Sequence, residues 1–297
     1  MLFAQQTQEQ LGVQYYQNKE YDKALATFEE LFNQNPSQFN YIYYTNCLIE
    51  TRDYEKAEKV IKKQGKVNHA DPRFRVDMGY IFAMQGDDQK GRKIYEECLK
   101  DLQADRSTVY NLANAFMTRR EVDFAVRTYV RGRELFKDPN MFALELAYMY
   151  ESLGNSECML DEYLKLIRTQ PEQLNMVENR LQAWLSLDIY NEKNEAFRTL
   201  LLKRTQQNPD DIIYAELLLW YSIQQKDFSL ALIQAKALDR RYAETGKRII
   251  DLARLAVSNK DYDVAIDAYN YVIRKNADAD LVLSGRIELL NTEFQRI

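Results

Sequence analysis

Apolar and polar positions along the chain repeat with a period of 33 or 34 residues over most of its length. Four similar segments mark this period, and each runs from a polar stretch into an alanine: residues 18–24, 51–57, 119–125 and 259–265. Between these segments, apolar residues recur three and four positions apart, the spacing that places side chains on one face of a helix. A period of this length is typical of arrays in which each small unit buries the apolar faces of its neighbours. The sequence therefore predicts stacked short helices and an extended surface.

Counting each unit from its first residue, as offset 1, gives a common frame. The units start near Gln5, Gln38, Pro72, Arg106, Asn140, Glu178, Ile212 and Gly246. Offsets 4, 7, 8 and 11 share one face of a first helix, and offsets 20, 24 and 27 share one face of a second. Small residues at offsets 8 and 20, such as Gly79 and Gly91, are expected where the two helices come closest. All five prolines lie at boundaries between units, where proline suits the first turn of the next helix: Pro36, Pro72, Pro139, Pro171 and Pro209.

In this frame the first unit resembles the tetratricopeptide repeat, a family of paired antiparallel helices. The residues that carry the resemblance are Leu11, Gly12, Tyr15, Tyr21, Ala24, Phe28 and Pro36, and the same pattern covers nearly the whole chain. The resemblance implies an all-α fold, a right-handed α-α superhelix (solenoid) of about eight helix pairs with a C-terminal capping helix. The chain looks like a bacterial, exported array of this family.

The phasing of the repeat predicts the layout of the chain. We expect well-phased units 1 to 5 over residues 5–171, an irregular helix pair over 172–211, units 7 and 8 over 212–279 and a capping helix over 280–297. The irregular pair has Phe197 where a small residue is expected, so its helices should pack at a different angle. The capping helix carries Leu283, Ile287 and Leu290 along one stripe. We expect that stripe to cover the apolar face of the last pair, as terminal caps of such arrays do.

Charge disfavours a nucleic-acid partner. The 297 residues include 40 Lys and Arg against 45 Asp and Glu, a net charge of −5, and both signs are interspersed along the chain. Binding to phosphates needs a clustered positive field, which this balance does not provide. The densest basic stretch starts at Arg119 and ends at Lys137, and acidic neighbours dilute it. We interpret that stretch as a solvated helix face.

The N-terminus bears on localisation. No window approaches the 18 or so consecutive apolar residues of a membrane span. Residues 1–6 resemble the end of a bacterial secretion signal, in which a short apolar run closes on Ala4 before a polar start at Gln5. This pattern favours a periplasmic or otherwise exported protein, and a cytoplasmic location is the alternative.

The residues that usually carry chemistry form no recognisable reaction centre. Cys47, Cys98 and Cys158 are odd in number and widely spaced, so they predict neither a disulfide framework nor a metal site, and Cys98 falls on a core-facing position. The single histidine, His69, lies in a linker without a second ligand nearby in the sequence. The glycine spacing of residues 86–91 matches a phosphate-binding loop, but the Lys-Ser/Thr ending and the preceding strand are missing. We therefore expect no enzyme, no cofactor and no metal.

The candidate site is a surface. In the repeat family, the first helices line a concave groove through offsets 2, 5, 9, 12 and 13, and peptides bind there. At offset 9 this chain alternates Asn and Tyr through four units, and aromatic and apolar residues lie near. Such a lining suits an uncharged segment with apolar side chains, because amides pair with a peptide backbone and aromatic rings offer large contact areas. The predicted groove residues are Phe39, Ile42, Tyr43, Asn46, Tyr80, Tyr110, Asn114, Tyr148 and Trp220.

The same frame argues against one function of the family. Members that hold the acidic C-termini of chaperones use a clamp of Lys, Asn and Arg at set offsets, and only Arg73 fits that pattern here. We therefore predict a non-catalytic scaffold that binds a protein or peptide partner, but no chaperone tail and no nucleic acid. The alternative is a sensory or regulatory input segment of a longer signalling or transcription-regulating protein.

Overall fold

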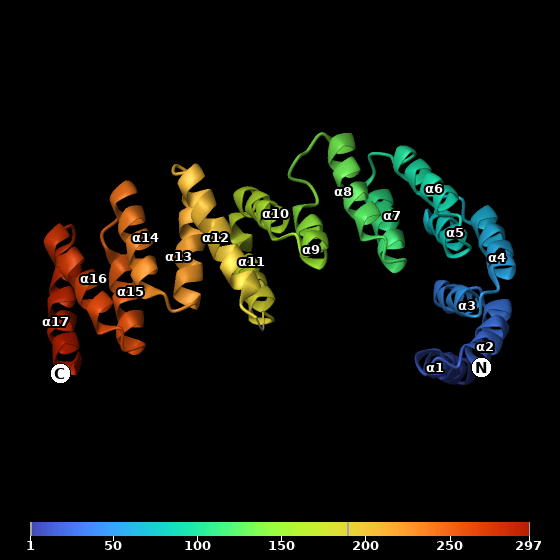
Figure 1. Ribbon diagram of the computed structural model, residues 1–297, viewed down its shortest axis with the longest axis horizontal. Helices are drawn as coiled ribbons and strands as arrows, with labels where there is room; N and C mark the ends of the chain where they lie inside the picture. Colours follow the sequence, from blue (N-terminus) through green and yellow to red (C-terminus); the bar gives the residue numbers. More distant parts are fainter. Residues whose placement is uncertain (1, 189, 297) are drawn as a thin grey trace. The chain divides into compact units, whose positions relative to one another are not determined.

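The chain is helical throughout its described part. The computed structural model describes residues 2–188 and 190–296, with side chains from residue 7 onward. Within these residues there are seventeen α-helices, one short 3-10 helix and no strand (Figure 1). The α-helices follow one another as eight pairs, from α1 with α2 to α15 with α16, and α17 comes last. The predicted fold class, an all-α array of about eight pairs with a closing helix, is confirmed.

The helices belong to two compact units, residues 1–166 and 167–297, each described here by itself. The helices of the first unit are α1 (Leu2–Gln17), α2 (Tyr21–Gln34), α3 (Gln38–Glu50), α4 (Tyr54–Val67), α5 (Arg73–Met84), α6 (Asp88–Lys100), α7 (Arg106–Thr118), α8 (Val122–Phe136), α9 (Ala143–Ser152) and α10 (Ser156–Thr169), whose last residues belong to the second unit.

The second unit holds the remaining helices. They are the 3-10 helix η1 (Pro171–Gln173), α11 (Leu174–Ser186), α12 (Glu192–Gln207), α13 (Ile212–Gln224), α14 (Phe228–Arg241), α15 (Lys247–Ser258), α16 (Tyr262–Lys275) and α17 (Ala279–Arg296).

The turn inside each pair has one recurring geometry. The residue at offset 15 has a positive φ in seven of the eight pairs, where left-handed backbone reverses the chain: Lys19, Arg52, Gly86, Arg120, Gly154, Lys226 and Lys260. The next residue is often an Asp that caps the second helix. Asp53 accepts a hydrogen bond from the Lys56 backbone N–H, and Asp261 accepts one from Val264. The repeated polar segments of the sequence are therefore turn and cap.

Small residues lie where the paired helices meet, as the frame predicts. A Cβ added to Gly91 would lie 2.6 Å from the Gly79 carbonyl oxygen, and one added to Gly79 would overlap the ring of Tyr95. The same arrangement recurs in the first pair, where a Cβ on Gly12 would lie 2.9 Å from the Phe28 ring. Large side chains fill the space that the glycines leave, because Tyr95 and Phe28 are themselves almost fully buried.

The irregular pair, α11 and α12, fills its centre differently. Phe197 stands where six of the other seven pairs have Gly or Ala, and its side chain is fully buried. Its ring lies edge-on to Trp184 of α11, with centroids 6.0 Å apart, and to Tyr221 of α13, at 5.5 Å. A different packing angle for this pair stays a prediction.

The sequence interpretation of α17 is wrong in one respect. Leu283, Ile287 and Leu290 do not cover the last pair, because their side chains are 60%, 54% and 67% exposed. The opposite face packs inward, through Val282 and Gly285. The reason lies in the frame itself, since offsets 3 and 6 of a first helix face the preceding pair. Offsets 4, 8 and 11 of a first helix face the second helix of the same pair. The described residues contain no second helix that pairs with α17 in this way.

The structure describes most of the proposed signal remnant and allows a search for membrane-spanning helices. The proposed signal remnant, residues 1–6, includes Met1, which lies outside the described residues, and the backbone from residue 2 onward is part of α1. Over residues 2–188 and 190–296, no helix has the length and apolar character that crossing a membrane requires.

Candidate partner-binding face

The predicted groove residues of the first unit lie on four first helices. Phe39, Ile42, Tyr43 and Asn46 are on α3, Tyr80 is on α5, Tyr110 and Asn114 are on α7, and Tyr148 is on α9. All eight keep some solvent access, and Phe39, Tyr110 and Asn114 are exposed. We call these eight residues the inner-helix row. Trp220, on α13, lies in the second unit and is half-buried.

One end of the row is an aromatic cluster. The ring of Tyr43 stacks on that of Phe28 in α2, with centroids 4.8 Å apart, and Tyr16 of α1 lies edge-on to it at 5.5 Å. Phe39 packs beside both Tyr43 and Phe28 while remaining 42% exposed. Phe39 and Tyr43 thus hold the first two pairs together, and only their outer edges are available to a partner.

Tyr110 is tied to the next pair along the chain. Its hydroxyl donates a hydrogen bond of 2.6 Å to Glu145 of α9, and its ring lies 5.5 Å from that of Phe142. Burial, together with the hydrogen bond to Glu145, raises the pKa of Tyr110 to about 12. The hydroxyl is therefore engaged within the protein, and the exposed part of this side chain is the ring.

A buried arginine holds the middle of the row. Arg119, at the end of α7, donates a hydrogen bond of 2.7 Å from Nη1 to Asn46 Oδ1 and lies over the ring of Tyr80, 5.1 Å from the centroid. One guanidinium thus joins the second, third and fourth pairs. Among the described residues, Asn46 Nδ2 donates no hydrogen bond, so this amide can still donate to a partner.

The buried carboxylate of Asp77 holds the Arg119 guanidinium in position. Asp77 Oδ1 accepts from Arg119 Nε at 2.6 Å, and Asp77 Oδ2 accepts from the Tyr41 hydroxyl at 2.7 Å. The side chains of Arg119 and Asp77 are only 6% and 2% exposed. Burial, the largest single influence, lowers the pKa of Arg119, but the charge and hydrogen bond of Asp77, together with Tyr41 and Tyr80, outweigh it and the pKa lies above its ordinary value. Burial and the Asp77 charge likewise raise the pKa of Tyr41 well above its ordinary value.

The interpretation of Arg119 as part of a solvated basic face is wrong. Its neighbours Thr118 and Arg120 are exposed, but Arg119 itself is buried because its guanidinium pairs with Asp77 of α5. The sequence does hold one signal for this pair. Asp77 lies at offset 6 between Val76 and Met78, and a charge inside an apolar helix face calls for a partner of opposite sign.

The second unit has its own accessible hollow, which sequence reasoning missed. A cavity of about 410 Å³ lies between the first helices α13 and α15, with Leu219, Ile223, Leu252 and Leu255 among its lining residues. Leu255 is 44% exposed. The charged residues that line the cavity are Glu244, Lys247, Arg248 and Asp251. Leu219 and Leu252 lie at the core offsets 8 and 7, so nothing in the sequence distinguishes them from buried residues. Leu255 at offset 10 and Ile223 at offset 12 lie outside the core offsets, and offset 12 is one of the groove offsets.

Groups that could hold a metal or act as nucleophiles are few. Over residues 2–188 and 190–296, no three His, Cys, Asp or Glu side chains are placed to hold a metal ion. Cys98 is buried, as expected, and so is Cys47, whereas Cys158 is partly accessible. Burial raises the pKa of the Cys47 thiol to about 12 and that of Cys98 to about 11.

Comparisons with known proteins agree with the repeat. Residues 6–37, which hold most of α1 and all of α2, match the tetratricopeptide repeat family. No curated protein matches the sequence.

Solved structures of low similarity include three tetratricopeptide repeat proteins. The TPR2AB domain of yeast Sti1, in complex with pHSP90, is 13% identical, with 100% of this chain and 99% of that chain covered and a TM-score of 0.30. The P58(IPK) TPR domain is 13% identical, with 98% of this chain and 99% of that chain covered and a TM-score of 0.28. The C-terminal part of a TPR protein from Cytophaga hutchinsonii is 15% identical, with 82% of this chain and 98% of that chain covered and a TM-score of 0.29.

Proposed function

We propose that this chain is a non-catalytic scaffold that binds a segment of a partner protein along the inner-helix row. The observation that carries the proposal is the accessible series Asn46, Tyr80, Asn114 and Tyr148, one from each of four successive first helices. An array of helix pairs with such a series offers a long recognition surface rather than a reaction centre.

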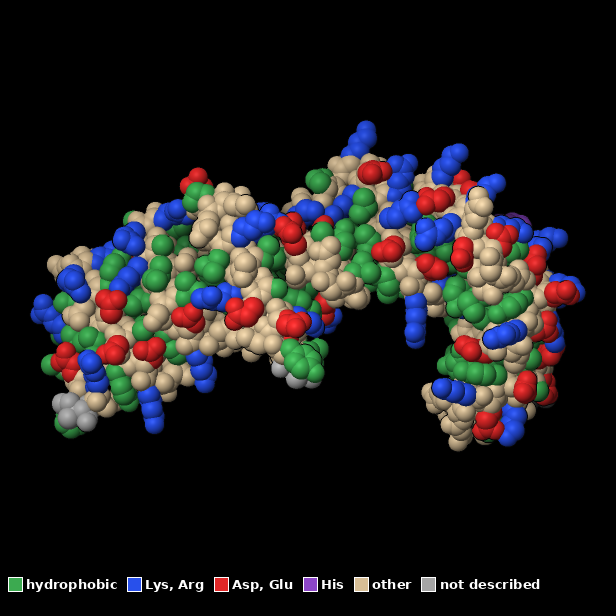
Figure 2. Space-filling view, in the orientation of Figure 1, with side chains coloured by type: hydrophobic (Ala, Val, Ile, Leu, Met, Phe, Trp, Pro, Cys, Tyr) green, Lys and Arg blue, Asp and Glu red, His purple; other side chains and the backbone are tan. Residues whose placement is uncertain are grey.

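The partner's chemistry follows from the groups that remain available. Asn114 is exposed, and the Nδ2 of Asn46 donates no hydrogen bond to any described residue. Both amides can therefore pair with a peptide backbone. The rings of Tyr80 and Phe39 add apolar contact area. None of the eight residues of the inner-helix row is charged, and over the face seen in Figure 2 Lys and Arg are interspersed with Asp and Glu, which favours an uncharged segment with apolar side chains over a highly charged one.

The first unit's face is preorganised, which favours binding. The Asp77–Arg119 pair fixes Asn46 and the ring of Tyr80 before any partner arrives. Side chains that are already held in place lose less conformational freedom on binding, so more of the contact energy appears as affinity.

The test is affinity capture of partners from a lysate of the source organism, quantified by mass spectrometry. The variant Tyr80→Ala/Asn114→Ala/Tyr148→Ala is expected to lose captured partners at least tenfold, and Trp220→Ala reports separately on the second unit. Helical circular dichroism should be unchanged in both. The control, Val130→Ala, alters a side chain that is 37% exposed on the second helix α8 and should capture normally. Normal capture by the triple variant would contradict the proposal.

Export from the cytoplasm stays part of the proposal. Its motivation is the likeness of residues 1–6 to the end of a secretion signal. Fractionation of cells that express the native gene should recover the protein outside the cytoplasm, and recovery in the cytoplasmic fraction alone would overturn this point.

A further inference from the structure

The last described helix, α17, presents an apolar stripe to solvent. Its side chains are 60% exposed at Leu283, 54% at Ile287, 67% at Leu290 and 80% at Phe294. The spacing of four, three and four residues is the heptad spacing of a helix that packs along another helix. A contiguous exposed apolar surface of this kind marks an interaction site more often than an isolated exposed leucine does. We call these four residues the α17 stripe.

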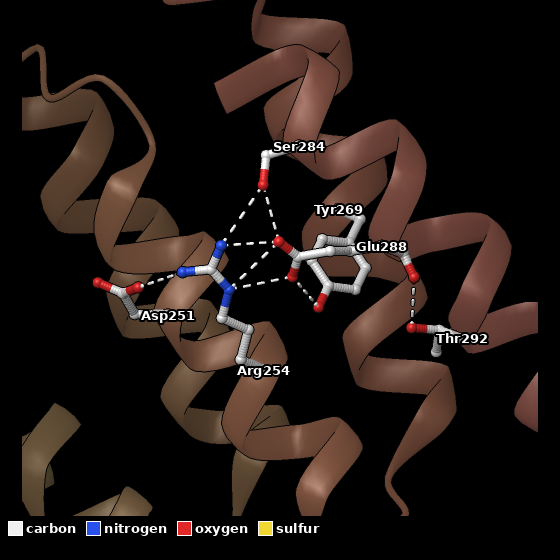
Figure 3. A network of polar contacts seen from close by, with 6 residues as sticks. All are labelled: Asp251, Arg254, Tyr269, Ser284, Glu288 and Thr292. Carbon is white, nitrogen blue, oxygen red and sulfur yellow. Dashed lines mark hydrogen bonds and ion pairs between the residues drawn. The ribbon is translucent and has the colours of Figure 1, made fainter. Parts of the chain in front are cut away.

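The opposite face of α17 is anchored, so the stripe is held in a fixed orientation. Figure 3 shows Glu288 of α17 accepting hydrogen bonds from Arg254 of α15, at 2.7 Å, and from the Tyr269 hydroxyl of α16, at 2.9 Å. Ser284 donates to Glu288 as well, at 2.7 Å. Gly285 lies on this docked face, because a Cβ added there would be in ordinary van der Waals contact with Ile250, at 3.5 Å, and with Ile273, at 3.6 Å. The helix is therefore docked by one face while the stripe stays uncovered within the described chain.

The two flanks of the stripe differ in charge. Arg286 and Glu293 lie on one flank, two helical turns apart, and both are exposed. Within residues 2–188 and 190–296, neither takes part in an ion pair. Ser284 and Asn291 lie on the other flank, which carries no charge of its own. One flank thus holds a positive and a negative group at the spacing of one heptad, in the positions that select partner and direction in paired helices.

We propose that the α17 stripe binds the α17 stripe of a second copy of this chain, antiparallel, about a two-fold axis. In that register Leu283 meets Phe294 of the second copy, and Ile287 meets Leu290 of the second copy. The same register brings Arg286 opposite Glu293 of the second copy, and the two-fold axis repeats this ion pair. A two-fold interface requires a surface that is complementary to itself, and the charges of this flank meet that requirement.

The length of α17 argues against the second helix of a further repeat as the occupant of the stripe. In seven of the eight complete pairs the chain turns at offset 15, where φ is positive, and the second helix then packs back on the first. In α17 that offset is Phe294, which is still helical, and the helix continues to Arg296. Pairing along a heptad stripe uses all four apolar residues of this longer helix.

The first experiment is sedimentation velocity of the full chain from about 1 to about 100 μM, because dimer formation depends on protomer concentration. The wild type is expected to sediment as a dimer at the upper end of this range, and Ile287→Asp as a monomer throughout. The matched control is Ile233→Asp, which changes a side chain that is 61% exposed on α14 and should leave the dimer intact. Both positions are exposed, so helical circular dichroism should be unchanged. A wild type that is monomeric at every concentration, or a dimer that Ile287→Asp leaves intact, would overturn the proposal.

The second experiment tests the antiparallel register. Arg286→Glu and Glu293→Arg should each weaken dimerisation about tenfold or more, because each places two pairs of like charges in contact. The double variant Arg286→Glu/Glu293→Arg restores both ion pairs in the proposed register and should recover the wild-type dissociation constant. A double variant as weak as the single ones would exclude this register and overturn the proposal, leaving the stripe to the helix of another protein.

Discussion

The buried pair of Arg119 and Asp77 gives the sharpest test of how the first unit is held together. Replacing Arg119 with Met removes the guanidinium but keeps an apolar stem of similar length. The Asp77 carboxylate, 2% exposed, would then keep only the Tyr41 hydroxyl as a hydrogen-bond donor among the contacts that the structure shows. Breaking a buried ion pair from one side costs about 3–5 kcal/mol, because a charge is left buried without its partner. We expect Arg119→Met to lower the free energy of unfolding of the first unit by that amount.

The second arm of this test neutralises both groups. In Asp77→Asn/Arg119→Met no charge is buried, and the carbonyl oxygen of the new amide can still accept from the Tyr41 hydroxyl. Removing a whole buried pair is far less harmful than removing half of it, so the double variant should recover most of the loss. Arg131→Met is the matched control, since the Arg131–Glu134 pair is exposed at both side chains and is expected to contribute about 1 kcal/mol or less.

Urea unfolding followed by two probes separates the units. Both tryptophans, Trp184 and Trp220, lie in the second unit, so tryptophan fluorescence reports on that unit, whereas far-ultraviolet circular dichroism reports on both. Arg119→Met should shift the circular dichroism transition of the first unit with little change in fluorescence. The reasoning is refuted if Arg119→Met lies within about 1 kcal/mol of the wild type. It is also refuted if the double variant is no more stable than Arg119→Met.

Two further predictions follow from burial and charge. In the native protein, Cys158 should react quickly with a disulfide reagent, whereas Cys47 and Cys98 should react only as the protein unfolds. The reason is that burial shields the Cys47 and Cys98 thiols and raises their pKa. Equally fast reaction of all three thiols would contradict this prediction. The hydrogen bond from Arg254 lowers the pKa of Glu288 from its ordinary 4.5 to about 2, so the stability it contributes is present above pH 4.5 and is lost as the pH falls toward 2. Urea midpoints measured across this range should converge for the wild type and Glu288→Gln, and a constant difference would refute the assignment.

The local features of the fold could be predicted from sequence because each depends on a few neighbouring residues. The turn at offset 15, its capping Asp and the close contact at Gly79 and Gly91 all lie within one helix pair. The frame that aligns the pairs predicts the close contact, and the turn and its cap recur at fixed offsets of the same frame. Arg119 could not be placed in this way, because its three partners belong to two other pairs and meet it only after the array has stacked.

The face of α17 could not be assigned from sequence for a related reason. The helix has apolar residues on two sides, Val282 with Leu289 and Leu283 with Leu290, so amphipathicity alone favours neither. The larger stripe was the natural choice for the buried face. The structure buries the other side, where Val282 and Gly285 lie and where Glu288 reaches Arg254 and Tyr269.

Arg119 also limits how a partner can use the inner-helix row. A partner group that displaced the guanidinium from Asn46 or Tyr80 would have to leave Asp77 paired, since an unpaired buried carboxylate costs several kcal/mol. Binding that retains the pair uses the outward groups instead: the Nδ2 of Asn46, the exposed amide of Asn114 and the accessible part of the Tyr80 ring. We therefore expect Asn114→Ala to weaken partner binding without a stability loss, whereas Arg119→Met should reduce both together. If Arg119→Met left partner affinity unchanged while the first unit remained folded, preorganisation by Arg119 would play no part in binding.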